Sequence, residues 1–281
     1  MVYEFELSTI HLPLVRPFRT SFGTQTSREV LMVKVTNENG TVGWAECVAM
    51  SEPLYSPEYV IGCLDLMKRF LIPALRAKDS ITAEDVPVIL KPFLGGQMAK
   101  AALETAILDA QLKDAGVSLA KYLGATKTKV ECGVSVGIAN NLDSLVEEVK
   151  SYVDAGYRRI KLKIEPGWDY EAVKTIRNLY PDMPLQVDAN QAYSRNDGKL
   201  LAKLDEFNLL LIEQPLDEHD ILGHAMLAKE VKTPICLDES IISLQSAEDA
   251  LALKATTVIN IKPGRVGGYI ESKKIHDLCA K

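Results

Sequence analysis

Residues Arg158–Ile164 read RRIKLKI, and this short stretch decides how the second half of the chain folds. Its aliphatic residues alternate with other residues, a pattern that predicts a buried β-strand. Lys161 and Lys163 lie two positions apart, so both side chains leave the same face of that strand. Two ammonium groups on one face of a core strand repel each other, and lysine is rarely buried without a partner. The pattern therefore predicts negative charge nearby.

Four polar residues downstream continue the pattern at a regular interval. Each ends a short apolar run, and they are Asp188, Glu213, Asp238 and Lys262. Counted from Lys163, the successive spacings are 25, 25, 25 and 24 residues, with helical patterns such as 170–179 and 244–253 between the runs. One strand, one helix and two loops fill such an interval, so the repeat predicts βα units and a parallel sheet. The carboxyl ends of barrel strands meet at one mouth, which places these side chains around one site.

We call Lys161, Lys163, Asp188, Glu213, Asp238 and Lys262 the ladder residues. The three carboxylates among them predict a metal site. Asp188, Glu213 and Asp238 are oxygen donors with no His or Cys among them, which suits Mg²⁺, Mn²⁺ or another divalent metal rather than zinc. The lysines of the ladder would face an anion bound to that metal. A single carboxylate at a strand end is as often a solvated loop residue or a helix cap, but three at the spacing of barrel units favour the metal site.

Several motifs around these residues resemble a known family. They are Lys161-Leu162-Lys163, Asp188-Ala189-Asn190, Glu213-Gln214-Pro215, Asp238-Glu239-Ser240 and NIKPGRVGG at 260–268. Together they resemble the enolase superfamily and its muconate-lactonizing subgroup. The stretches RPFRTSFG at 16–23, GVSVGI at 133–138 and IEPGWD at 164–169 look like the o-succinylbenzoate synthase / N-acylamino acid racemase family. The resemblance covers the whole chain.

The first part of the chain has a different pattern. Strand patterns at 3–12, 28–36 and 42–48, with a hairpin turn at Asn37–Gly40, predict an antiparallel meander. Helices are predicted at 57–75 and 97–115, the second ending before Gly116. We therefore expect an α+β capping domain at residues 1–125.

Residues 126–281 are expected to form an enolase-type (β/α) barrel domain in an α/β fold. We predict strands near 134, 160, 185, 210, 235 and 258 and a last helix from Gly268. That gives about six βα units, whereas a closed barrel of this type has eight. The family pattern continues with two further units, so we expect a C-terminally truncated chain.

Two segments of the capping domain are expected to be loops, Arg16–Gln25 and Glu46–Tyr59. By resemblance they cap the barrel mouth and contact the substrate, with Arg19 as a carboxylate contact and Met50 on the side chain. The alternative is that they are ordinary turns whose apolar residues pack locally. Ser135, in the first barrel strand, is expected either to hydrogen-bond the substrate or to fill the barrel lip.

The resemblance also implies a reaction and a role for each ladder residue. A divalent metal and a lysine base remove the proton next to a carboxylate and give an ene-diolate. Lys163 would act on one face of the substrate and Lys262 on the other, which permits racemisation. Lys161 would bind the substrate carboxylate. The same site could dehydrate a β-hydroxy acid, which by resemblance makes o-succinylbenzoate in menaquinone biosynthesis.

Neighbouring residues would support this chemistry. Asn190 is expected to bind substrate, Glu239 to tune the metal ligands and Arg265 to tune Lys262. The glycines at 264, 267 and 268 superficially resemble a phosphate loop, but no Walker-type Lys-Ser/Thr follows them. The open alternatives are a dipeptide epimerase, a muconate cycloisomerase or a catalytically silent remnant.

Composition bears on the possible partners, and the family resemblance implies a small-molecule carboxylate as the substrate. A net charge of −6 over 281 residues favours neither nucleic acid nor an anionic membrane. No apolar run approaches the roughly 20 residues of a membrane span. Five scattered cysteines and the absence of a signal-peptide pattern predict a cytoplasmic protein with reduced thiols. A homo-oligomer is expected.

Overall fold

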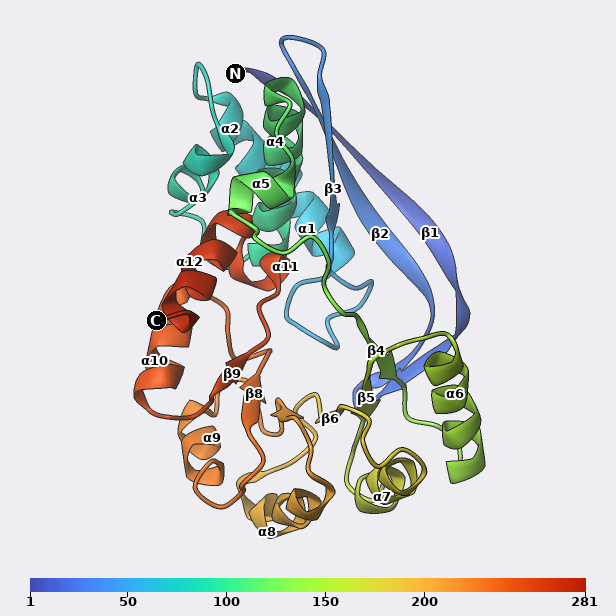
Figure 1. Ribbon diagram of the computed structural model, residues 1–281. Coiled ribbons are helices and arrows are strands. Elements are labelled where there is room, and N and C mark those ends of the chain that lie inside the picture. Colours follow the sequence, from blue (N-terminus) through green and yellow to red (C-terminus); the bar gives the residue numbers. More distant parts are fainter.

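Two sheets of different kinds divide the chain. The computed structural model describes residues 1–281 (Figure 1). The first sheet is antiparallel, in the order β1 (Tyr3–Thr20), β2 (Gly23–Asn37), β3 (Val42–Cys47). The second is parallel and follows chain order: β4 (Gly133–Val136), β5 (Arg159–Lys163), β6 (Leu185–Asp188), β7 (Ile212–Glu213), β8 (Ile235–Leu237), β9 (Val258–Ile259). The predicted α/β fold with six βα-type strands is confirmed, and β4 and β9 are the edges of the sheet.

Short helices and one long helix cover the antiparallel sheet. They are α1 (Val60–Leu66), η1 (Met67–Leu71), α2 (Ile72–Arg76), η2 (Ala83–Asp85), α3 (Val86–Ile89), α4 (Gln97–Ala115) and α5 (Leu119–Leu123). α4 has the predicted bounds, and Gly116 caps it at a φ of 62°. The predicted helix at 57–75 begins only at Val60 and contains the π-helical turn η1 before Pro73. Proline has no N–H to donate to the preceding turn, which favours this irregularity.

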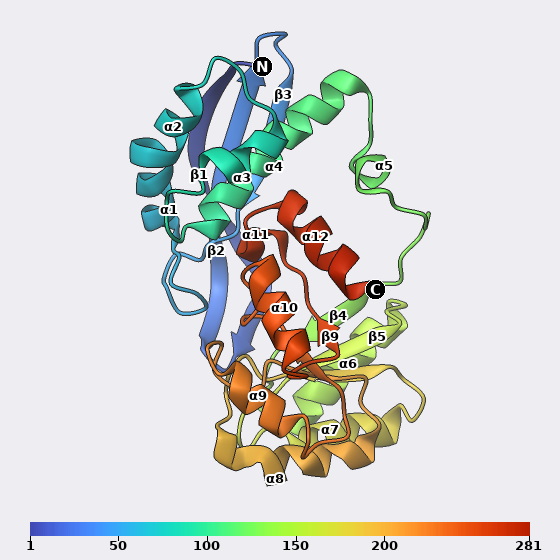
Figure 2. The ribbon, with the colours of Figure 1, turned by 90° about the vertical axis from the view of Figure 1, so that its left-hand side faces the viewer.

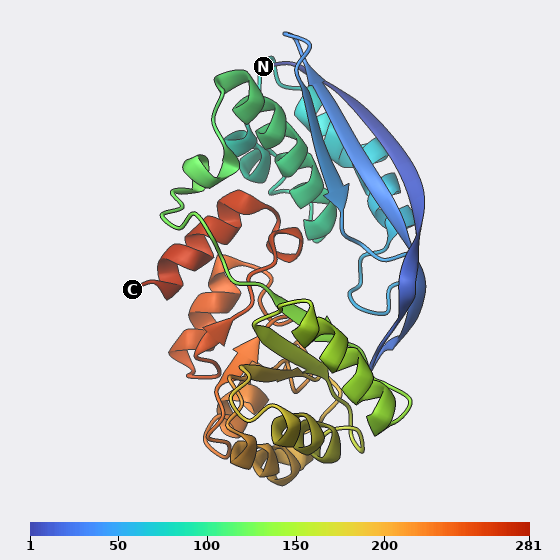
Figure 3. The ribbon, with the colours of Figure 1, turned by 45° about the vertical axis from the view of Figure 1, so that its right-hand side comes forward.

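The segment predicted as a loop at 16–25 is instead the end of a long β-hairpin, so that prediction is wrong. β1 and β2 pair as far as Thr20 and Gly23, with a register shift between Pro13 and Phe18. The hairpin runs down one side of the molecule to the parallel sheet (Figure 3). There the Ile138 amide donates to the Arg19 carbonyl at 2.9 Å, and this contact beyond β4 gives the end of the hairpin a fixed partner.

Helices between and after the parallel strands lie outside the sheet (Figure 1). They are α6 (Leu142–Asp154), α7 (Tyr170–Leu179), η3 (Arg195–Asp197), α8 (Gly198–Leu201), η4 (Ala202–Phe207), α9 (Ile221–Leu227), α10 (Leu244–Ala252), α11 (Pro263–Val266) and α12 (Tyr269–Cys279). α6, α7 and α12 match the predicted helices closely because their apolar positions recur at helical spacing. No helix in the protein is both long enough and apolar enough to cross a membrane.

α12 joins two separate hydrophobic cores. Tyr269 and Ile270 pack against the cluster formed by the capping domain. Ile275 and Leu278, further along the same helix, belong to or pack against the cluster of the parallel sheet. Figure 2 shows α12 between α4 and α10. The position of α12 therefore depends on both halves of the chain.

Glu104 of α4 lies where the two cores meet and gives the fold a pH dependence. Its side chain is fully buried, and burial, with Glu84 and Glu271 as minor contributors, raises its pKa from 4.5 to about 7. The folded state therefore holds this proton more tightly than the unfolded state does. The resulting stability is fully present below pH 4.5 and is lost as the pH rises to about 7.

We therefore expect Glu104→Gln to flatten part of the pH profile of stability. Between about pH 6 and about pH 8 the wild type should lose about 1 kcal/mol more unfolding free energy than the variant, because only the wild type ionises there. Urea unfolding at the two pH values measures this difference. Parallel profiles for the two proteins would contradict it.

Candidate active site

Lysines and carboxylates alternate across the carboxyl ends of β5, β6 and β7. Lys163 pairs in register with Asp188, and Asp188 with Glu213. Lys163 Nζ lies 2.6 Å from Asp188 Oδ2. Lys161 Nζ lies 3.0 Å from the same oxygen and 2.9 Å from Glu213 Oε2. The negative charge predicted beside the two lysines is therefore present on the next two strands.

A second cluster follows β8 and β9. Lys262 Nζ lies 2.6 Å from Asp238 Oδ2, and Arg265 forms an ion pair with the other oxygen of Asp238. Lys262 also donates a 2.8 Å hydrogen bond to the Tyr55 hydroxyl, which lies 3.3 Å from Asp238 Oδ2. The Lys262 side chain is 41% exposed, whereas that of Lys163 is 9% exposed. Lys262 therefore relies on a side chain from the capping segments.

Buried amides connect the two clusters. Asn190 Oδ1 accepts a 2.6 Å hydrogen bond from Lys163, and its Nδ2 donates to Glu239 Oε1 at 2.9 Å. Gln214 Oε1 accepts from the Asp238 amide at 2.9 Å. Asn190 and Gln214 have positive φ values of 42° and 37°. Such strain outside glycine is held only where surrounding contacts require it.

Electrostatics differ between the two ends of the site. Burial opposes ionisation of Asp188, but Lys163 and Lys161 outweigh it and hold the pKa of Asp188 below its usual value. Burial likewise acts to lower the pKa of Lys161, but Asp188 and Glu213 outweigh it and raise that pKa overall. The surroundings therefore favour the ionised forms of both Asp188 and Lys161.

The other end holds carboxyls that are harder to ionise. Burial raises the pKa of Asp238 to about 6, although Lys262 opposes the shift. Burial and the neighbouring Asp238 raise the pKa of Glu239 to about 8. Burial lowers the pKa of Arg265 to about 10. Additional positive charge would relieve this crowding of buried carboxyls.

The carboxylate oxygens at the site are the kind of ligand that a divalent cation prefers. Asp188 and Glu213 end β6 and β7, and Asp238 directly follows β8. All three are almost fully buried and offer oxygen atoms only. Glu239 Oε2 is buried beside them without a hydrogen-bond partner. As they stand, no three acidic, His or Cys side chains converge closely enough to hold a metal ion, since lysine ammonium groups contact the carboxylates.

Two cavities border these residues. One, of about 440 Å³, is lined by Phe22 and Tyr55 from the two capping segments and by Asn190. The Phe22 and Tyr55 rings are 5.5 Å apart. The other, of about 360 Å³, lies along the strands and includes Lys161 and Ser135. Ser135 Oγ is buried without a partner, so a polar group is available there.

Two residues predicted to contact substrate make other contacts in the structure. Arg19 is ion-paired with Glu165 at 2.8 Å rather than with a ladder residue. Met50 forms a β-bridge with Tyr59 and lines a different cavity, among residues of β2 and β3. The structure therefore gives neither residue a contact with the ladder.

Tyr55, Gln214 and Asn260 were not singled out as site residues. Asn260 Nδ2 donates to Glu213 Oε1 at 2.8 Å. Gln214 and Asn260 stand inside the quoted motifs, so their position next to ladder residues was the available signal. Tyr55 is 207 residues from Lys262 in sequence, and only the tertiary structure reveals that contact.

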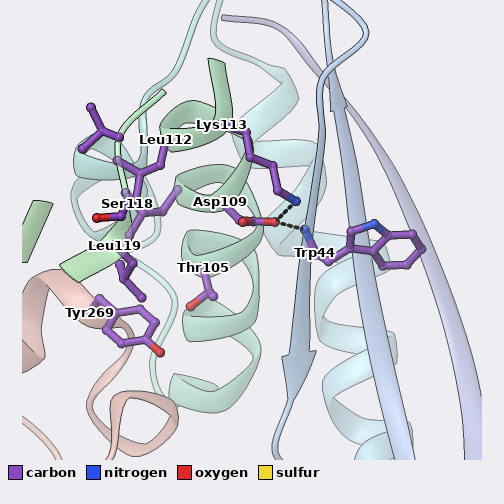
Figure 4. Close-up of a pocket in the computed structure, with 10 residues that line it drawn as sticks. Trp44, Thr105, Asp109, Leu112, Lys113, Ser118, Leu119 and Tyr269 are labelled. Atoms are coloured by element: carbon purple, nitrogen blue, oxygen red, sulfur yellow. Dashed lines mark hydrogen bonds and ion pairs between the residues drawn. The ribbon is translucent and has the colours of Figure 1, made fainter. Parts of the chain in front are cut away.

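A further cavity, of about 330 Å³, lies beside α4 and away from the ladder (Figure 4). Its polar residues Asp109 and Lys113 are paired with each other at 2.6 Å. Asp109 also accepts from the Trp44 amide at 2.9 Å. Because these groups already satisfy one another and no ladder residue lines this space, it is not the candidate active site.

Comparisons with known families agree with this architecture. Residues 5–124 match the mandelate racemase / muconate lactonizing enzyme N-terminal domain, and residues 144–281 match the enolase C-terminal domain-like family. The chain therefore belongs to the mandelate racemase / muconate lactonizing enzyme family of the enolase superfamily, and the predicted relationship is confirmed.

Relatives with curated names narrow the comparison. An N-succinylamino acid racemase of Amycolatopsis sp is 54% identical, over 98% of this chain and 75% of the relative. An o-succinylbenzoate synthase of Bacillus subtilis is 44% identical, over 99% of this chain and 75% of the relative. The crystal structure of an enolase superfamily member from Listeria innocua has a TM-score of 0.93 and 39% identity, over 98% of this chain and 74% of that one. An L-Ala-D/L-Glu epimerase of Bacillus subtilis is more distant, at 28% identity over 99% of this chain and 77% of the relative.

We expect Mn²⁺ or Mg²⁺ to stabilise the folded protein through the three carboxylates. At a metal concentration about a hundredfold above the dissociation constant, the stabilisation should reach about 2.7 kcal/mol. Glu213→Gln should lose most of this gain. Asp205→Asn should keep it, because Asp205 instead binds the amides of Lys232 and Thr233. Thermal unfolding with and without metal measures the effect, and an equal gain in both variants would contradict the assignment.

Proposed function

We propose that this chain catalyses metal-dependent removal of the proton next to a carboxylate, as an o-succinylbenzoate synthase, an N-succinylamino acid racemase, or both. One observation carries the proposal: Lys163 and Lys262 lie at the carboxyl ends of different strands, each hydrogen-bonded to its own buried carboxylate. The names and identities of the relatives support the choice of these two activities.

The ladder residues suit this chemistry by position and charge. Lys161, held between Asp188 and Glu213, offers a lasting positive charge for the substrate carboxylate. Lys163, fixed by Asp188 and Asn190, is the base on one face of the substrate. Asp188, Glu213 and Asp238 would hold a divalent metal, which would supply Lewis-acid stabilisation to the negative charge that develops on the substrate carboxylate.

The two lysines support both reactions. In racemisation one lysine removes the α-proton and the other returns a proton to the opposite face. In dehydration of a β-hydroxy acid, one lysine removes the α-proton and then helps hydroxide leave. The tyrosine and arginine that contact Lys262 or its carboxylate have no counterpart around Lys163, so the two faces are not equivalent.

Two other readings are less well supported. Dipeptide epimerisation uses the same proton abstraction, but the relative with that kind of activity shares only 28% identity. A catalytically silent remnant would have no need for the lysine and carboxylate pairs that remain buried here. Metal binding alone does not separate these readings, whereas turnover does.

The setting of the enzyme is also part of the proposal. All five cysteines are free thiols, which supports a reducing, cytoplasmic compartment. Menaquinone biosynthesis is the pathway proposed for the synthase activity, and a homo-oligomer is the proposed assembly.

Proton NMR of N-succinyl amino acids in D₂O tests the proposed chemistry. With Mn²⁺ or Mg²⁺ we expect loss of the α-proton signal from both enantiomers. Lys163→Ala should abolish exchange of one enantiomer and Lys262→Ala that of the other, because each lysine serves one face. A retained signal with folded, metal-loaded wild type would overturn the catalytic proposal.

Tyr55→Phe should slow the reaction on the face of Lys262 only. Losing a hydrogen bond to a charged group costs about 1.5 kcal/mol, or roughly tenfold in rate. Exchange of the enantiomer served by Lys163 should change by less than about twofold. Tyr59→Phe is the matched control, because the Tyr59 hydroxyl makes no hydrogen bond to the ladder. Equal slowing of both enantiomers would contradict this role of Tyr55.

A further inference from the structure

Glycines crowd the segment that follows Lys262, and the proposed chemistry does not use them. Gly264 lies against the capping domain so closely that a Cβ there would overlap the Val48 side chain. At Gly267, where φ is 95°, a Cβ would lie 3.4 Å from Gln97 Oε1. These glycines therefore allow close contact between α11 and the capping domain, and they form no phosphate loop.

The third glycine, Gly268, carries the tightest of these contacts. A Cβ at Gly268 would overlap the carboxyl group of Glu104, a residue of α4. Glu104 is fully buried, and its Oε1 accepts a 3.2 Å hydrogen bond from the Ile270 amide in the first turn of α12. Its Oε2 has no partner. The carboxyl group thus lies directly over the turn between α11 and α12.

This turn is connected to Lys262 through α11. Lys262 immediately precedes α11, and Arg265 within α11 pairs with Asp238, the same carboxylate that Lys262 contacts. A shift of the turn would move both cations relative to Asp238. Lys163 stands on β5 inside the parallel sheet and does not depend on the turn.

A residue that only filled this space would not need to be a carboxylic acid. Burial raises the pKa of Glu104 to about 7, and the charged groups that face it, Glu84 and Glu271, are both negative. An apolar side chain of similar size would avoid the cost of burying this group. What an apolar side chain lacks is the acceptor for the Ile270 amide.

We propose that Glu104 is a positioning residue for Lys262. It acts through the contact of its carboxyl group with Gly268 and through the hydrogen bond it accepts from the first turn of α12. The inference rests on the proposed function only for the role of Lys262. This contact requires side-chain volume and a hydrogen-bond acceptor at position 104. The amide of glutamine supplies both, whereas methionine supplies the volume alone.

Glu104→Met and Glu104→Gln form the matched pair that tests this role. In D₂O exchange, Glu104→Met should slow the enantiomer served by Lys262 about tenfold and the other less than about twofold, with KM changed less than about twofold. Glu104→Gln should stay within about threefold of wild type for both enantiomers. Asp205→Asn, which alters a carboxylate–amide contact far from α12, should leave both rates unchanged.

Amide hydrogen exchange of residues 262–272 supplies a readout that does not need turnover. The Ile270 amide should lose protection in Glu104→Met and keep it in Glu104→Gln. Equal slowing of both enantiomers by Glu104→Met, or no slowing, would overturn the positioning role. If the wild type exchanges neither enantiomer, the proposed function fails. Unchanged protection of the Ile270 amide in Glu104→Met would then also overturn the proposed contact between Glu104 and the first turn of α12.

Discussion

The pairing of lysine with carboxylate across neighbouring parallel strands is the constraint on which the rest of the structure depends. Lys163 stands in register with Asp188, and Lys161 bridges Asp188 and Glu213. A buried charge without its partner costs several kcal/mol, so these strands have little freedom to pair differently. A slip of one residue would also turn the lysines to the other face of the sheet. The same contacts thus set the register and assemble the site.

The second lysine is held in a different way. Lys163 is almost buried and has its partners on neighbouring strands, whereas Lys262 is 41% exposed and follows the last strand. Its hydroxyl partner, Tyr55, and the glycine-rich turn that follows it both depend on the capping domain. The site therefore combines one lysine fixed by the sheet with one lysine fixed at the contact between two domains.

The sequence predicts the features that local patterns control. The interval of about 25 residues, the bounds of α4, α6 and α7, and the convergence of the ladder all follow from periodicity. Contacts across long separations leave no such pattern. The hairpin end at 16–25 is held by a hydrogen bond from the backbone beyond β4. Arg19 forms an ion pair with Glu165, and Met50 lines a cavity among residues of β2 and β3. Tyr55 meets Lys262 only because the domains dock.

Because Lys163 and Lys262 are held by different parts of the structure, dehydration and racemisation can be altered separately. Dehydration needs one lysine to remove a proton, whereas racemisation needs a proton donor on the other face as well. Residues that act on Lys262 from the capping domain can therefore change racemisation without disturbing the pairs around Lys163. Because α12 packs into both cores, it connects the capping domain with Lys262 through the short helix α11. With the roles proposed for the two lysines, a change at the domain contact is expected to alter racemisation more than dehydration.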